Sequence, residues 1–271
     1  GGKSGPTVSA FRKAVDVMEA KQDVDIQLLA IPGIRHPSVT DYTVESVERR
    51  FDALYLMDIE AKDKVDSFVT SSLQVINVGN TISAFQSRAV DSSFAAAYFP
   101  DVVIEDSTTQ TNVVAPASAV VLGALALNDA IGHPWFAPAG FSRGALQTGL
   151  YTTVALGQEN RDDLYSADIN PIIDNHPSQA GVVVWGQKTL LAAQSALDRV
   201  NVRRLLIDVR RKVRDVARTF LFEPNQASTI AAFSAQVQPI LALIQSQGGL
   251  DRFQVKIDAS TTTQADAENN T

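Results

Sequence analysis

The sequence contains no cysteine among its 271 residues. This absence excludes disulfide bonds, thiolate nucleophiles and zinc sites built on sulfur, and it suits a reducing cytoplasm. Histidine is almost as scarce, and each of the three histidines is followed by proline: His36, His133 and His176. Because no H-x-H or H-x-x-x-H pair occurs, the sequence predicts no dedicated metal site.

The sequence also lacks the patterns that recognise nucleotides, nucleic acids and membranes. Neither G-x-G-x-x-G nor G-x-x-x-x-G-K-[ST] occurs, so we expect no phosphate cradle. The net charge of −7 opposes general binding to nucleic acid, because phosphate contacts need a basic surface. The longest uncharged apolar run, Val113 to Leu127, has 15 residues and is too short to span a bilayer. We interpret it as a buried helix with Pro116 in its first turn, and we expect no membrane insertion.

Strand-like and helix-like patterns alternate in the first half of the chain. Asp25 to Ile31 is a short apolar run closed by Pro32-Gly33, and Asp52 to Glu60 and Phe94 to Asp106 are further buried strands. A capped segment of mixed polarity, Thr40 to Phe51, predicts a helix. Strands and helices at this spacing predict an α/β fold with a mixed, partly parallel sheet and crossover helices.

The second half begins with a loop-rich stretch and continues as a helical half packed on a sheet. Residues 132–180 are rich in proline and glycine, and Gly181 to Gly186 reads as a short strand. Three helices and a last strand are expected in order: Lys188 to Val200, Asn201 to Phe220, Asn225 to Gln247, and Arg252 to Asp258. The expected regions are a partly loose segment 1–19, a core 20–258 divided into an α/β part 20–130 and a loop-rich, helical part 131–258, and a polar tail 259–271.

One pentapeptide, Gly140 to Gly144, fits the G-x-S-x-G pattern of a nucleophile elbow centred on Ser142. An elbow needs a buried strand before the serine and a helix after it, but "HPWFAPA" precedes this one, with two prolines. Downstream, the available partners are His176 and Asp174. A hydrolase using Ser142 is therefore the weaker alternative, and local hydrogen bonds to the backbone explain the serine.

The strongest physical signal is an arginine-rich amphipathic helix. Residues 199–218 contain eight Lys or Arg and two Asp, a net of +6, which leaves −13 for the rest of the chain. A core-facing stripe is formed by Val202, Leu205, Leu206, Val209, Val213, Val216, Ala217 and Phe220. Asp208 and Asp215 lie where i,i+3 or i,i+4 pairing reaches Arg204, Arg211, Lys212 and Arg218. On the opposite side Arg203, Arg210 and Arg214 form a flank with no acid beside them on the helix.

Three interpretations of this flank remain open. The first is a solvated face with local ion pairs. The second is a docking strip for a carboxylate-rich protein surface, because arginine binds carboxylates in a bidentate manner. An acidic body with one basic strip can also meet copies of itself head to tail. Nucleic acid ranks last, since the rest of the chain repels phosphate.

An ordered series of motifs resembles the sheath protein of contractile phage tails. The most specific of them are W-F-A-P-A-G…R-G, L-Y…I-N-P-I, W-G…T-L and V-R-R-L…F-E-P-N. The matching stretches, in chain order, are "DVDIQLLAIPGI", "FAAAYFPDVVIED", "APASAVVLGALALNDA", "HPWFAPAGFSRG", "DLYSADINPI", "GVVVWGQKTL" and "NVRRLL…RTFLFEPN". They run across residues 20–258.

The resemblance implies a structural protein with no catalytic residues and no cofactor. Subunits of this family assemble in sixfold rings stacked helically around a tail tube, and contraction drives the tube through the host envelope. The implied partners are other sheath subunits, the tail tube protein, and baseplate and tail terminator proteins; the implied place is the virion, after assembly in the host cytoplasm. A sheath from a bacterial contractile secretion or toxin-delivery machine is the alternative.

The resemblance also changes the interpretation of the pentapeptide and of the chain ends. In this family the "APAG…RG" segment belongs to the sheath core, so Arg143 joins Arg203, Arg210 and Arg214 as a candidate interface residue. The chain begins with glycines and ends at Thr271, where family members usually continue into a further strand. We therefore expect a trimmed fragment that lacks linking arms, is soluble and largely monomeric, and leaves a sheet edge open.

Overall fold

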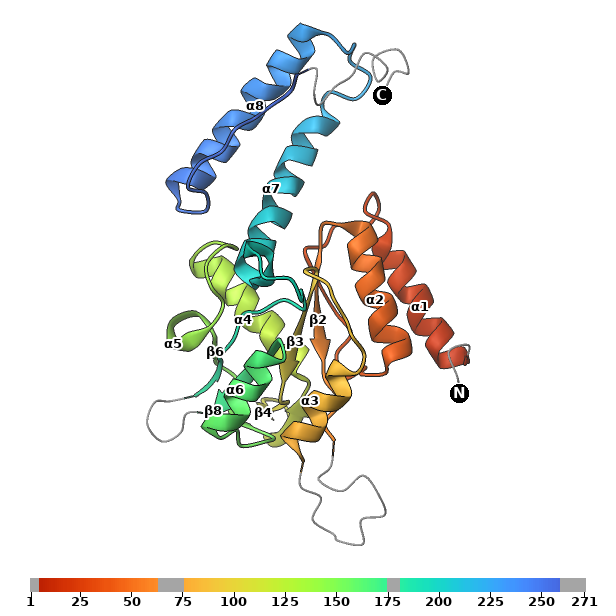
Figure 1. Cartoon of the computed structure of the whole chain (residues 1–271), viewed down its shortest axis with the longest axis vertical. Helices are drawn as coiled ribbons and strands as arrows, with labels where there is room; N and C mark the ends of the chain where they lie inside the picture. Colours follow the sequence, from red (N-terminus) through yellow and green to blue (C-terminus); the bar gives the residue numbers. More distant parts are fainter. Residues whose placement is uncertain (1–4, 63–75, 175–180, 259–271) are drawn as a thin grey trace, which may run out of the picture. The chain divides into compact units, whose positions relative to one another are not determined.

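The computed structural model describes residues 5–62, 76–174 and 181–258 (Figure 1). It divides into two compact units, residues 1–204 and 205–271. We describe each unit by itself. The boundary lies within one long helix, whereas residue 130, where the sequence predicted a change of character, lies inside the first unit.

A six-stranded mixed sheet forms the centre of the first unit. Its first four strands are parallel, and its last two are antiparallel to their neighbours. The order across the sheet is β1 (Leu28–Ala30), β2 (Leu54–Asp58), β3 (Ala95–Phe99), β8 (Ile169–Asp174), β9 (Val182–Val184) and β6 (Ala145–Leu146). Every residue of β2 and β3 is buried, as expected for central parallel strands that read as continuous apolar runs. The predicted α/β fold class is confirmed.

A second, antiparallel sheet has three strands: β5 (Thr111–Ala115), β4 (Val102–Asp106) and β7 (Gly149–Thr152). A register shift between Val103 and Ile104 interrupts the pairing of β4 with β7. Strand β5 lies at one edge of this sheet, and four of its five residues are exposed.

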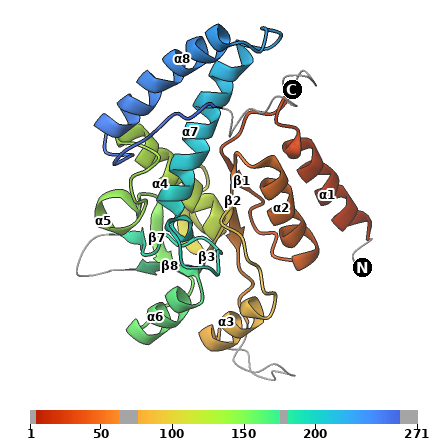
Figure 2. The same ribbon diagram turned by 45° about the horizontal axis from the view of Figure 1, so that its top comes forward.

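The described residues of the first unit form six α-helices before α7 begins. They are α1 (Pro6–Glu19), α2 (Pro37–Arg50), α3 (Val78–Gln86), α4 (Ala117–Ile131), the short α5 (Gly140–Arg143) and α6 (Gln158–Ser166). Helix α4 packs against β1, β2 and β3, α2 packs against β2, and α6 packs against β8. Helices α1 and α2 lie side by side in both views (Figures 1 and 2).

The N-terminal segment is helical from Pro6, although the sequence suggested a partly loose segment. Side chains tie α1 to α2: the Arg12 guanidinium lies 4.8 Å from the centre of the Tyr42 ring, and Tyr42 donates a hydrogen bond to Asp16. Arg49 forms an ion pair with Glu19 at 2.8 Å. These partners are far apart in sequence, so composition alone does not reveal them.

A buried ion pair at the end of α2 holds the segment between α1 and β1 in place. Arg50 and Asp52 are almost completely buried and lie 2.7 Å apart. Arg50 also donates to the carbonyl oxygens of Met18 at 2.5 Å and Val24 at 2.6 Å. One cation therefore holds the end of α1 and the loop that follows it.

Three predicted elements differ from the structure. The run Val113 to Leu127 was expected to be one helix, but its first residues belong to β5, and α4 begins only after Pro116. Lys188 to Val200 is not a helix: it forms isolated bridges and a short 3₁₀ turn, Ala196–Asp198. Its backbone bonds to the sheet region instead, with Leu190 donating to the carbonyl of Ala95 at 2.9 Å.

The alternating segment Arg252 to Asp258 does not form a strand within the described residues. A strand needs a partner for its backbone groups, and alternation alone does not supply one. Conversely, α6 and β8 occupy the stretch that the sequence suggested was loop-rich. The predicted polar tail 259–271 lies outside the described residues.

The second unit is built on the long helix α7 (Val200–Arg218), which begins in the first unit, and on α8 (Ala227–Ser246). The rings of Phe220 and Phe233 meet edge to face at 5.7 Å, where α8 doubles back (Figure 2). Helix α8 carries no charged side chain. It is long and apolar enough to cross a membrane by length and composition, which for a single helix is weak evidence. The absence of membrane insertion therefore stays a prediction.

Candidate interaction site

The loop that contains Ser142 does not have the geometry of a nucleophile elbow. Ser142 is exposed on the four-residue helix α5, and no strand runs into it. The next residue, Arg143, donates from Nε to the carbonyl oxygen of Ala137 at 3.0 Å, and its guanidinium lies 5.4 Å from the Phe136 ring centre. Arg143 therefore stabilises its own loop while it stays partly exposed. The predicted triad partner His176 lies outside the described residues.

Two carboxylates occupy the N-terminal end of α4, a position where many α/β proteins bind an anion. At the end of β2, buried Asp58 accepts hydrogen bonds from the backbone of Gly33 at 2.8 Å and of Ser118 at 2.6 Å. Asp101 accepts from the backbone of Ala117 at 3.1 Å. Burial raises the pKa of Asp101, although the nearby Arg35 acts in the opposite direction. The positive end of α4 is thus satisfied by the protein itself, and a phosphate has no place there.

The two described histidines have local structural roles. His36 caps α2, where its Nδ1 accepts a hydrogen bond from the backbone of Ser38 at 3.2 Å. His133 stacks on Trp135 with ring centres 4.5 Å apart. Within the described ranges, no group of three or more His, Asp or Glu side chains is placed to hold a metal ion.

Arg203 does not belong to an exposed flank, which corrects the prediction from helical periodicity. It is 6% exposed, and it donates to the hydroxyl of Ser93 with its guanidinium 4.0 Å from the Phe94 ring centre. Burial lowers its pKa. Arg204 is also buried and pairs with Asp129 at 2.5 Å. The partners of both arginines come from other elements, so the helix sequence does not reveal them.

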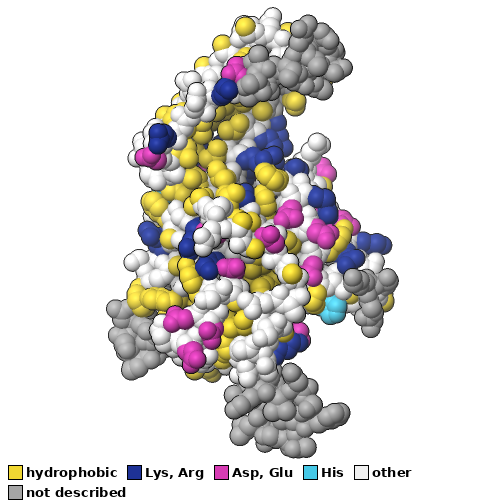
Figure 3. Space-filling view, viewed as in Figure 1, with side chains coloured by type: hydrophobic (Ala, Val, Ile, Leu, Met, Phe, Trp, Pro, Cys, Tyr) yellow, Lys and Arg dark blue, Asp and Glu magenta, His cyan; other side chains and the backbone are white. Residues whose placement is uncertain are grey.

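The remaining cations of the predicted strip lie further along α7. Arg210 is exposed and Arg214 is partly exposed, and Lys and Arg side chains gather over this helix in Figure 3. Lys212 pairs with Asp208 at 2.6 Å, and Arg218 pairs with Asp215 at 3.6 Å, as the spacing predicts. The candidate strip therefore consists of Arg210 and Arg214, and its role as an interface stays a prediction.

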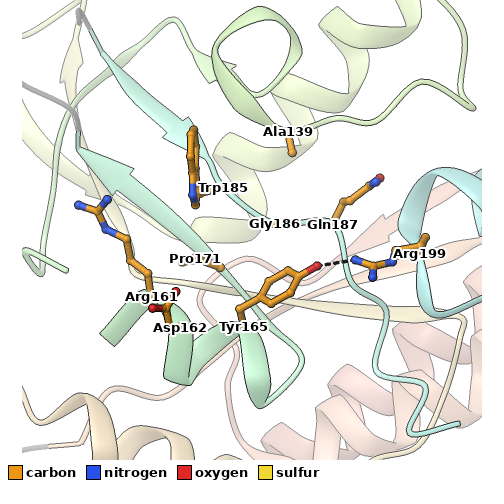
Figure 4. A pocket seen from close by; sticks show the side chains of 9 residues that line it. All are labelled: Ala139, Arg161, Asp162, Tyr165, Pro171, Trp185, Gly186, Gln187 and Arg199. Atoms are coloured by element: carbon orange, nitrogen blue, oxygen red, sulfur yellow. Dashed lines mark hydrogen bonds between the residues drawn. The ribbon is translucent and has the colours of Figure 1, made fainter. Parts of the chain in front are cut away.

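A pocket of about 350 Å³ on the first unit brings together several of the quoted motifs (Figure 4). Trp185 stands at one side of it, Tyr165 reaches towards Arg199, and Pro171 lies between these two aromatic residues. The Tyr165 hydroxyl accepts a hydrogen bond from Arg199 at 2.5 Å. The remaining lining residues are Ala139, Arg161, Asp162, Gly186 and Gln187. We did not predict this pocket from the sequence, although "APAG", "LY", "NP" and "WGQ" each supply part of it.

The wall of the pocket is held rigidly by Asn170. This fully buried side chain donates to the carbonyls of Ala97 at 3.0 Å and Lys188 at 2.8 Å, and it accepts from the backbone of Lys188 at 2.6 Å. A Cβ atom on Gly186 would lie 2.8 Å from the Asn170 side-chain oxygen, so a glycine is needed there. The pocket is therefore preformed rather than made by side chains that move freely.

Comparison with known proteins gives a consistent result along the whole chain. The phage tail sheath protein central domain matches residues 9–190, and the phage tail sheath C-terminal domain matches residues 192–270. The tail sheath protein of Enterobacteria phage T4 is 26% identical over 266 residues, which cover 95% of this chain and 40% of that protein. The tail sheath protein of Vibrio phage KVP40 is 35% identical over 153 residues, covering 56% of this chain and 22% of that protein. The chain thus spans less than half the length of these relatives.

Solved structures show the same fold. The chain resembles a protein of the anti-feeding prophage (AFP) baseplate with a TM-score of 0.71 and 22% identity, covering 94% of this chain and 65% of that one. It also resembles a protein of the extracellular contractile injection system PVC sheath complex in the contracted state, with a TM-score of 0.70 and 22% identity, covering 95% of this chain and 68% of that one. Because the central-domain match alone spans well over half of the sequence, the chain belongs to the phage tail sheath protein family.

Proposed function

We propose that this chain is the sheath-forming part of a subunit that polymerises as sixfold helical rings around a tail tube. Contraction of that lattice drives the tube through the host envelope. The observation that carries the proposal is the pair of family matches, which together account for nearly the whole chain. The partners are further sheath subunits, the tube protein, and baseplate and tail terminator proteins, and the assembled particle is the virion.

The proposed role is structural, without a catalytic site or a cofactor. Two local arrangements support this: Ser142 lacks a preceding strand, and Asp58 and Asp101 fill the anion position at the start of α4. An active-site serine probe is expected to leave the protein unlabelled. Labelling that disappears in Ser142→Ala would instead establish hydrolase chemistry.

Negative-stain microscopy of the longer parent protein tests the assembly directly. Hollow, striated tubes are the expected result, because a helical sheath lattice has a regular axial repeat. Only dispersed particles under all assembly conditions would contradict the proposal.

The cations Arg210 and Arg214 are the proposed contact with an acidic surface of a neighbouring subunit or of the tube. The variant Arg210→Glu/Arg214→Glu is expected to weaken sheath assembly and its dependence on salt, since exposed charge contacts are screened by ions. The matched control Arg252→Glu/Lys256→Glu makes the same change in net charge elsewhere on the second unit, where both side chains are exposed. If the two variants assemble equally well, Arg210 and Arg214 form only a solvated face.

A sheath of a bacterial contractile injection machine is the second candidate. The resemblance to the AFP and PVC proteins favours it, although at this identity the likeness concerns the fold. Neighbouring genes separate the candidates: capsid and genome-packaging genes accompany a phage tail, whereas toxin-loading genes accompany an injection machine.

A further inference from the structure

The pocket beside Trp185 has chemical needs that the described part of the chain does not meet. The Trp185 side chain is 43% exposed, and its ring lies 5.3 Å from that of Phe141, which is equally exposed. A suitable occupant therefore brings an apolar group for the aromatic rings.

The charged residues of the pocket add a second requirement. Arg161 and Arg199 line it together with one carboxylate, Asp162, which accepts from the side-chain amide of Gln158 at 3.1 Å. Arg199 also pairs with Asp198 at 3.1 Å, whereas Arg161 donates from Nε to the backbone carbonyl of Leu156 at 3.1 Å. Arginine favours carboxylates as partners. The occupant that satisfies both needs is a polypeptide segment with an apolar side chain next to an acidic one. Tryptophan, tyrosine and arginine are also the residues that most often dominate protein interfaces.

This chain displays such a segment in the turn between α7 and α8. The side chain of Phe222 is fully exposed, and the next residue, Glu223, is exposed as well. Phe222 has a φ of +70°, a left-handed conformation that is rare for a bulky residue. Such conformations gather at functional sites, where the surrounding structure holds them. The turn thus presents an aromatic ring and a carboxylate together.

We propose that Phe222 and Glu223 of one copy dock into the pocket formed by Trp185, Tyr165 and the arginines of a second copy. The Phe222 ring enters the 350 Å³ pocket beside Trp185, and Glu223 meets Arg161 and Arg199 at its rim. The two surfaces differ, so the contact is heterologous and repeats from copy to copy, as a ring or a helical array requires. The inference deepens the proposed sheath function by naming one contact between subunits.

Cross-linking between two single-cysteine variants tests the contact, because the natural sequence has no cysteine. Leu221→Cys places a thiol beside the turn, and Asp162→Cys places one at the pocket; the two chains carry tags of different size and are mixed under oxidation. The expected product is a heterodimer that forms about tenfold faster than with Val17→Cys in place of Leu221→Cys, since a docked anchor raises the local thiol concentration. Val17 is a suitable control because its side chain is 60% exposed on α1.

Two further variants show whether the named side chains make the contact. Phe222→Ala in the Leu221→Cys chain is expected to reduce cross-linking to the control rate. Glu223→Arg is expected to do the same, and Arg161→Glu in the pocket chain is expected to restore it. A rate equal to the control in the starting pair would overturn the proposal. Faster cross-linking that Phe222→Ala leaves unchanged would also overturn it.

This experiment separates the contact from the broader function. It uses the 271-residue chain in solution and needs no assembled tube. If the parent protein forms tubes but the cross-link does not form, the sheath function stands and this contact is wrong. If the cross-link forms but the parent protein forms no tubes, the contact stands and the sheath function is wrong.

Discussion

The two units of the chain differ in where their notable polar and apolar side chains lie. The first unit buries polar groups and gives them partners: Arg50 pairs with Asp52, and Asp58 binds the start of α4. In the second unit large apolar groups face solvent, notably Leu221, Phe222 and Leu243. On α8 the buried residues are Val237, Leu241 and Ile244, out of twenty.

This difference separates a paired, buried polar network in the first unit from an exposed aromatic tip in the second. A buried, paired polar network specifies one arrangement, because breaking any member leaves an uncompensated group. An exposed aromatic tip next to a cationic helix costs little when free and offers binding energy when covered. We therefore expect substitutions in the buried polar network to change stability, and substitutions at the exposed tip or at the Trp185 pocket to change association.

The largest effect is expected from Asp52→Ala. It leaves the Arg50 cation buried without its carboxylate, and the free energy of unfolding of the first unit should fall by about 3–5 kcal/mol. Urea denaturation measures the loss. Glu45→Ala is the control, because Glu45 is exposed and lies 3.9 Å from Arg49, and it should change stability very little. Equal losses in both variants would remove the distinction between paired buried charges and surface charges.

A smaller loss is expected from Gly186→Ala, which tests the rigidity of the pocket wall. The added Cβ meets the Asn170 oxygen at 2.8 Å, so overpacking should cost about 1–3 kcal/mol. Gly157→Ala is the matched control, because a Cβ there meets nothing within 4 Å. If thermal unfolding showed the same midpoint for both variants, the wall would be able to move.

Acidification should weaken the contact between α1 and α2. Arg49 lowers the pKa of Glu19 below its usual 4.5, so the folded state binds fewer protons than the unfolded state. The stabilisation is present above pH 4.5 and is lost as pH falls through the lowered pKa. Its size should lie within the ~0–1 kcal/mol of surface ion pairs. Amide chemical shifts of α1 followed by NMR between pH 6 and pH 3 measure it, and Glu19→Gln should abolish the pH dependence.

The smallest effect, with the opposite sign, is expected from Phe222→Gly. Glycine accepts the left-handed conformation without cost, so stability should stay unchanged or rise by up to about 1 kcal/mol. Phe220→Ala, two positions earlier in the chain, should instead destabilise the unit, because Phe220 packs on Phe233. A clear loss of stability in Phe222→Gly would mean that Phe222 supports the fold rather than a contact with another copy.

Much of the fold was predictable where one segment carries its own signal. The parallel strands β1, β2 and β3, the crossover helix α2 and both C-terminal helices follow from apolar runs, caps and helical periodicity. The segment Lys188 to Val200 has the composition of a helix, yet its backbone hydrogen bonds go to the sheet region. Tertiary pairing there overrides local propensity.

The candidate site was predictable only in part. The spacing of charges on α7 correctly indicated the Lys212–Asp208 and Arg218–Asp215 pairs. It failed at Arg203, because Ser93 and Phe94, which bury it, lie about a hundred residues away. The pocket was not predicted because its lining residues are also distant in sequence: they come from α6, β8 and the segments after β9 and before α5.

The sequence alone excluded cysteine chemistry and indicated the α/β pattern and the family, because composition, periodicity and ordered motifs are all local properties of the chain. Tertiary structure decided which arginines are exposed, what occupies the start of α4, and that separate motifs line one pocket. Those properties depend on residues that are distant in the chain and adjacent in space. Burial and pairing are set by such neighbours, and no local pattern contains them.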